Sequence, residues 1–131
     1  MKKVLLVLII TLMTVAANAQ TSDGKYPVYC DVVGYCLWNK VTVQLDLGRN
    51  LSKKRFDTLY GEDGKQMKFN TMVDVLNYMG ERGWRVINSY YVQETTTDVH
   101  DNTVHYLMEK RVASNDEITI GLNLKEVEQK D

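Results

Sequence analysis

Alternating hydrophobic and polar residues predict a β-hairpin near the start of the chain. Residues 26–34 read YPVYCDVVG and are rich in the β-branched and aromatic residues that favour strands. Further along, the hydrophobic positions of VTVQLDL (41–47) alternate strictly with polar ones. A strand of this kind has one buried face and one face in solvent. The two segments predict an antiparallel hairpin whose connection includes Asn39 and Lys40.

A different period predicts one helix in the middle of the chain. Hydrophobic residues recur there at the i, i+3, i+4, i+7 spacing of a helical face: Met72, Val75, Leu76 and Met79. Asn70 or Thr71 can accept a hydrogen bond from the free amides of the first turn. Thr71 and Asp74 have the spacing of a capping box, in which each side chain accepts a hydrogen bond from the other residue's backbone N–H. The segment therefore predicts an amphipathic helix that packs on a sheet.

The sequence GERGW after this helix predicts a structural corner. Gly83 follows the last periodic turn, where a residue with positive φ commonly ends a helix. We expect Gly80 to let the helix end approach the sheet closely, and Trp84 to begin a strand and fill the space beneath the helix. Glycines that bind phosphate lie at a helix N-terminus, whereas these lie at a C-terminus. The corner needs no ligand.

Two further hydrophobic segments complete the predicted fold. A strand from Trp84 and the segment VHYLMEKRV (104–112) form a second hairpin, with the reversal favoured by Asp98, Asp101 and Asn102. Alternation from Ile118 to Leu124 predicts either a fifth strand or a mobile tail. We therefore expect an α+β fold: an antiparallel sheet of four or five strands from two hairpins, with one main helix packed on one face. Residues 26–112 form the single domain, and residues 113–131 form the tail.

The first 19 residues have the three parts of a secretory signal peptide. Lys2 and Lys3 precede an apolar run, which ends on the small residues Ala17 and Ala19. The run is short for a membrane span, so we expect cleavage, a flexible lead-in over 20–25, no membrane span in the mature chain, and a periplasmic or secreted location.

Charge and composition narrow the classes of partner. Without Lys2 and Lys3, the 16 basic residues become 14, against 17 acidic ones, a mature net charge of about −3. Because nucleic-acid affinity depends on neutralising phosphates, we expect no nucleic-acid partner.

The chain offers little catalytic or metal-binding chemistry. Cys30 and Cys36 are six residues apart on one extended segment, too far for a disulfide unless Gly34 permits a reversal, so Cys30 is expected to be a buried apolar group. His100 and His105, with Asp98 and Asp101, lie around a polar turn without the four ligands of structural zinc. Recognisable nucleophile and phosphate-binding motifs are absent. We assign no catalytic residue, cofactor or metal.

Strand alternation suggests an interaction face. If Trp84, Val86, Tyr90 and Val92 face the helix, then Arg85, Ile87 and Tyr91 face away from it, and Leu107 of the next strand joins them. This mixture of aromatic, aliphatic and Arg side chains is typical of protein interfaces. The alternative is that residues 118–124 or 48–57 fold over this face and bury it.

Residues 67–112, with their helix, Gly-Trp corner and HYLMEKR strand, resemble the domain-of-unknown-function 4177 type. The segments YCDVVG, NKVTVQLDLG and MKFNTMVDVLNYM resemble a set of small exported proteins of Bacteroides-type bacteria. These resemblances imply the fold and export but no activity, cofactor or catalytic residue.

The function that the sequence favours is an exported, non-enzymatic interaction or ligand-binding module, with a protein partner or self-association. The alternatives are a structural subunit of an envelope assembly and a small metal-dependent or hydrolytic enzyme.

The signal peptide gives a direct test. We expect mass spectrometry of protein from the native host to find a mature N-terminus at Gln20, because cleavage follows Ala19. An intact Met1 in the periplasmic or secreted fraction would contradict this.

Overall fold

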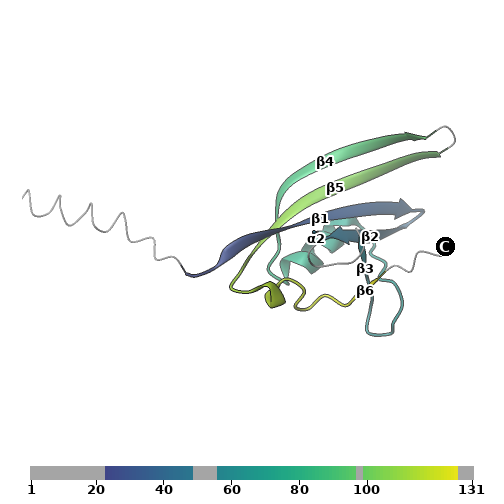
Figure 1. Cartoon of the computed structure of the whole chain (residues 1–131). Helices are drawn as coiled ribbons and strands as arrows, with labels where there is room; N and C mark the ends of the chain where they lie inside the picture. Colours follow the sequence, from purple (N-terminus) through teal and green to yellow (C-terminus); the bar gives the residue numbers. More distant parts are fainter. Residues whose placement is uncertain (1–22, 49–55, 97–98, 127–131) are drawn as a thin grey trace, which may run out of the picture.

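The computed structural model describes residues 23–48, 56–96 and 99–126; at 37, 94–96, 99–102, 125 and 126 it describes only the backbone. Six strands form one antiparallel sheet in the order β4-β5-β1-β2-β3-β6 (Figure 1). The strands are β1 (Tyr26–Leu37), β2 (Lys40–Asp46), β3 (Asp57–Leu59), β4 (Arg85–Thr96), β5 (Val99–Val112) and β6 (Leu124–Glu126). The helices in these residues are α2 (Met72–Gly80) and the 3₁₀ helix η1 (Asn115–Glu117). The predicted α+β class is confirmed.

The two predicted hairpins are present, with tighter turns than the sequence suggested. Lys40 pairs with Leu37, so only Trp38 and Asn39 connect β1 to β2, and Trp38 has a φ of +56°. In the second hairpin, Thr96 pairs with Val99. The backbone of residues 99–103, predicted as part of the turn, continues β5 instead.

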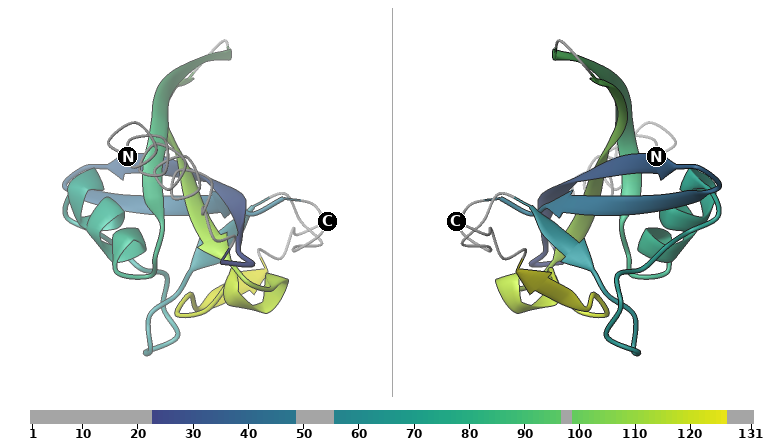
Figure 2. Two further views of the ribbon diagram at one scale, coloured as in Figure 1. Left: turned by 90° about the vertical axis from the view of Figure 1, so that its left-hand side faces the viewer. Right: turned by 90° about the vertical axis from the view of Figure 1, so that its right-hand side faces the viewer.

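Helix α2 lies against one face of the sheet (Figure 2), called the helix face here; the opposite side is the far face. Gly34 lies within β1, where a Cβ would collide with the sulfur of Met72. Glycine therefore permits the helix to approach the strand, and it does not reverse the chain. Both cysteines are free, Cys30 buried and Cys36 exposed, as expected for an extended segment.

The hydrophobic core lies between α2 and the helix face. Its members include residues from both sheet and helix: Cys30, Val32, Val43, Leu45, Val75, Met79, Trp84, Met108 and Val112. The predicted capping box is present, since Thr71 Oγ1 accepts from the Asp74 amide and Asp74 Oδ2 accepts from the Thr71 amide, both at 3.2 Å. No described helix is long and apolar enough to cross a membrane.

The corner after α2 is a Schellman motif. The Trp84 amide donates to Met79 O at 3.2 Å, and the Gly83 amide donates to Gly80 O at 3.0 Å. Gly83 has the predicted positive φ, +88°, and the Trp84 side chain is 2% exposed. The role expected of Gly80 was wrong: a Cβ at Gly80 would meet nothing within 4 Å, so no close approach to the sheet occurs there.

The tail does not form the predicted strand from residue 118. Instead, η1 and a turn carry Ile118 into the core and leave Ile120 62% exposed, while β6 begins only at Leu124 and pairs with β3. Gly121, with a φ of +79°, interrupts the extended conformation. Arg82 secures this turn to the helix, because its Nε donates to Gly121 O at 2.7 Å.

The two glycines of the corner should respond oppositely to alanine. We expect Gly83→Ala to lower the free energy of unfolding by about 1–2 kcal/mol, because its positive φ disfavours a Cβ. Gly80→Ala, with open space around it, should leave stability unchanged or raise it by up to about 1 kcal/mol. Urea denaturation measures both; equal effects would contradict this account.

Candidate functional site

A β-bulge decides which side chains share a face of β4 and β5. Val86 lies opposite Met108, but the next pair is Asn88 and Leu107, so Ile87 is an extra residue in β4. A bulge of this kind reverses the alternation of all residues beyond it.

The bulge separates the residues of the predicted interaction face. Arg85 pairs with Glu109, which pairs with Tyr29, and Leu107 pairs with Asp31, all on the far face. Tyr91 pairs with Val104, which pairs with Gly34 on the helix face. Arg85, Ile87, Tyr91 and Leu107 therefore do not form one patch. Tyr90 and Val92, expected to face the helix, lie on the far face instead.

On the far face, four polar side chains from three strands form a hydrogen-bonded group, named the Asp31 network: Asp31 of β1, Tyr90 of β4, and Thr103 and His105 of β5. The Tyr90 hydroxyl donates to Asp31 Oδ2 at 2.9 Å, and His105 Nδ1 lies 2.8 Å from the same oxygen. Thr103 Oγ1 lies 3.2 Å from His105 Nε2. The Tyr90 and His105 rings stack with centroids 4.7 Å apart. This network ties the β4–β5 hairpin to the centre of the sheet.

The order hydroxyl, imidazole, carboxylate resembles the nucleophile, base and orienting group of some hydrolases. Since a carboxylate only accepts, the Asp31 contact orients His105 with Nδ1 as donor, which in a neutral imidazole leaves Nε2 to accept from Thr103. However, Thr103 is only 7% exposed, so its hydroxyl is largely closed to a substrate. The geometry fits a structural link between strands better than a catalytic site.

Asp31 carries an unusual feature for a central strand. Its Oδ1 is buried without a hydrogen-bond partner among the described residues.

Burial raises the pKa of the adjacent Cys30 thiol, and the negative charges of Asp31 and Asp46 raise it further. The Cys30 thiol therefore stays protonated at neutral pH and is not a nucleophile.

The possible metal ligands around the second turn are only partly described. Asp98 lies outside the described residues, as do the side chains of His100 and Asp101, while His105 is engaged with Asp31. Within the described part of the chain, no group of three or more His, Cys, Asp or Glu side chains is placed to hold a metal ion.

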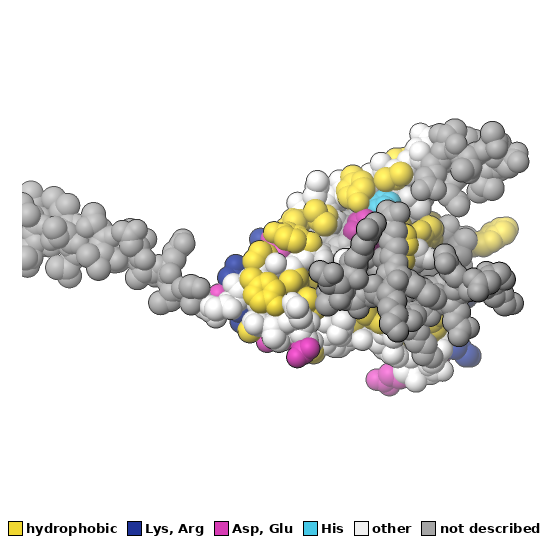
Figure 3. Space-filling model, viewed as in Figure 1, with side chains coloured by type: hydrophobic (Ala, Val, Ile, Leu, Met, Phe, Trp, Pro, Cys, Tyr) yellow, Lys and Arg dark blue, Asp and Glu magenta, His cyan; other side chains and the backbone are white. Residues whose placement is uncertain are grey.

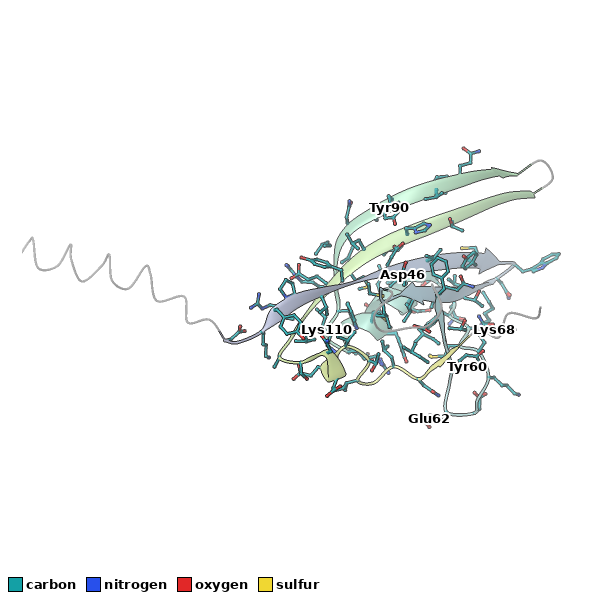
Figure 4. All side chains as sticks on the ribbon, in the orientation of Figure 1. Asp46, Tyr60, Glu62, Lys68, Tyr90 and Lys110 are labelled. Atoms are coloured by element: carbon teal, nitrogen blue, oxygen red, sulfur yellow. The ribbon has the colours of Figure 1, made fainter. Side chains whose placement is uncertain are left out.

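Exposed aromatic and aliphatic side chains gather around β4. Of nine exposed large hydrophobic residues in the described chain, four belong to this strand: Val86, Ile87, Tyr90 and Tyr91. Tyr91 is 57% exposed on the helix face, and Tyr29 is 50% exposed on the far face. Figure 3, which views the far face, shows hydrophobic side chains beside a histidine and a carboxylate. Figure 4 labels Tyr90 on the outer hairpin, away from Lys110.

Of the two segments expected to cover this surface, the one that the structure describes, residues 118–124, lies elsewhere. Ile118 packs in the core, and β6 lies at the opposite edge of the sheet from β4. The segment 49–55, the other expected cover, lies outside the described residues.

Comparison with known proteins adds no relative. No family model, curated protein or solved structure matches the chain. The resemblances to the domain-of-unknown-function 4177 type and to exported Bacteroides-type proteins stay predictions.

The Asp31 network can be tested with two neighbouring tyrosines. We expect Tyr90→Phe to lower the free energy of unfolding by about 1 kcal/mol, because it removes a partly exposed hydrogen bond to Asp31. Tyr91→Phe, the matched control on the other face, should change it by less than about 0.5 kcal/mol. In an Asp31→Ala background, which removes the acceptor, the Tyr90→Phe effect should shrink, and a double-mutant cycle by denaturation measures this coupling. Additive effects would show that the network does not link the strands.

Proposed function

We propose that this chain is a small exported, non-enzymatic interaction module that binds a protein partner along β4. The observation that carries the proposal is that β4 is a twelve-residue strand at the sheet edge, paired only with β5 among the described residues. The side of β4 that does not pair with β5 is named the β4 edge. Such an edge presents backbone N–H and C=O groups to which another extended segment can bind.

The side chains beside the β4 edge favour a protein partner. Tyr90 and Tyr91 project to opposite faces and are 44% and 57% exposed. Tyrosine is enriched at protein interfaces because it supplies a large rigid ring with a polar end. A partner strand would therefore gain side-chain contacts on both faces of the sheet.

The rival functions have less support. A hydrolytic enzyme would need access to a nucleophile, and the Thr103 hydroxyl is largely buried. A structural subunit of an envelope assembly would use the same edge, but in a repeating polymer. Export rests on the signal-like residues 1–19, and the acidic balance of charge disfavours nucleic acid as the partner.

Site-specific photocrosslinking tests the proposal in cells of the native host. A benzophenone side chain at Tyr91 should form discrete crosslinked products, because it would lie inside the interface. Ile120 is the control, since it is equally apolar and 62% exposed but lies in the turn between η1 and β6. Products of equal yield at both positions, or none at Tyr91, would overturn the proposal. A ladder of regularly increasing mass would indicate the structural assembly.

A further inference from the structure

We infer that the partner of the β4 edge is β4 of a second copy, paired antiparallel about a two-fold axis at Tyr91; this rests on the proposed function. The two six-stranded sheets would become one continuous sheet, with the α2 helices on the same side.

The inference begins from the contrast between the two sheet edges. Natural proteins block free edges with short strands, charges, proline or bulges. The edge strand β6 has three residues, so it offers little to a partner. In β4 the bulge at Ile87 lies near one end and leaves a long regular segment beyond it. Among the described strands, the β4 edge is therefore the longest that is free to pair.

The absence of charge in the central segment of β4 indicates which kind of strand can pair with it. Residues 87–93, INSYYVQ, carry no charge, so they offer nothing specific to a charged peptide. An antiparallel copy of the same segment places no like charges opposite each other within this run. Glu94 and Arg85 flank this run; Arg85 lies beyond the bulge and contacts Glu109 of its own chain at 3.5 Å.

The side chains of β4 indicate which residues of the two copies lie opposite each other. In an antiparallel pair about a two-fold axis, opposing residues lie on the same face, so an axis at Tyr91 sets the two Tyr91 rings opposite each other. The same register places Tyr90 of each copy opposite Val92 of the other, on the far face. Aromatic pairs and pairs of an aromatic with a β-branched residue are the favourable combinations across strands. An axis at Tyr90 would also pair two tyrosines, but it would set Tyr91 opposite Ser89 and Val92 opposite Asn88, which are less favourable pairs.

The pairing would also cover the exposed surface described above. Tyr91, the most exposed tyrosine of the described chain, would lie at the centre of the interface. The Asp31 network holds Tyr90 in place in the single copy, so part of the interface is already ordered before association.

Substitutions of Tyr91 by residues of opposite charge test the inference on the mature chain, residues 20–131. Light scattering with size exclusion should find a dimer of the wild type. Tyr91→Lys should raise the dimer dissociation constant roughly tenfold or more, because two ammonium groups would lie opposite each other. Tyr91→Glu should do the same, and an equal mixture of the two variants should recover the dimer. The matched control is Tyr29→Lys, similarly exposed but on β1, which should leave the dimer intact.

Each outcome bears on the inference separately from the proposed function. A wild type that is monomeric across a dilution series, or a dimer that Tyr91→Lys leaves unchanged while circular dichroism shows native folding, overturns pairing of two copies. Should Tyr91→Lys unfold, the Tyr91→Glu variant decides in the same way. If Tyr91 crosslinks in cells to a protein of another mass while the pure chain is monomeric, the proposed function stands and the second copy is refuted.

Discussion

A nine-residue helix cannot cover a hairpin whose strands have twelve and fourteen residues, and this limit decides which surfaces the protein leaves exposed. At a rise of about 1.5 Å per residue α2 is roughly 14 Å long, whereas β4 and β5 extend for roughly 40–46 Å. The helix buries the sheet around β1 and β2, where Gly34 lets Met72 approach. The far end of the β4–β5 hairpin extends beyond the helix (Figure 2). The exposure of Tyr91, which lies on the helix face of that hairpin, follows from the lengths of the elements.

A hairpin that extends beyond its core needs other means of support, and polar contacts supply them. In the Asp31 network, Tyr90 and His105 contact the Asp31 carboxylate, and Thr103 contacts His105. A charged group this deeply placed costs free energy unless it is hydrogen-bonded. Asp31 meets that requirement at Oδ2, and the contacts of this one oxygen with Tyr90 and His105 link three strands.

Local signals in the sequence predicted the helix and its ends well. The Thr71 capping box, the hydrophobic period of α2 and the positive φ of Gly83 depend on residues within a few positions of one another. The strict alternation of β2 correctly predicted a strand with a buried face, but the polar face is not in solvent as expected, because Thr42 is buried and Gln44 and Asp46 are half-buried. Gly80 was misjudged because sequence gives no measure of the space around a residue.

The sequence did not predict the features that depend on the register of the strands. The bulge at Ile87 leaves no clear mark in RVINSYYVQ, where hydrophobic residues occur in adjacent pairs and fit either alternation. Asp31 and His105 are 74 residues apart, and only the pairing of β1 with β5 brings them together. One signal was available: a single Asp within a strand of β-branched and aromatic residues needs a buried partner. In the tail, the alternation of hydrophobic residues from Ile118 to Leu124 does not form a strand over this length, because the 3₁₀ turn and Gly121 interrupt the extended backbone.

The difference between the two edges of the sheet is the strongest physical argument for an interaction role. Edge strands expose the protein to unwanted pairing, and β6 limits this risk by its length. The β4 edge combines a long strand, an uncharged segment and tyrosines on both faces, with only the bulge near one end to restrict pairing. A single lysine in the segment 87–93 would block such pairing at little cost to the fold, since most side chains there are exposed. The proposed binding of a strand at this edge would explain why the edge is left open where one substitution would close it, whichever protein supplies that strand.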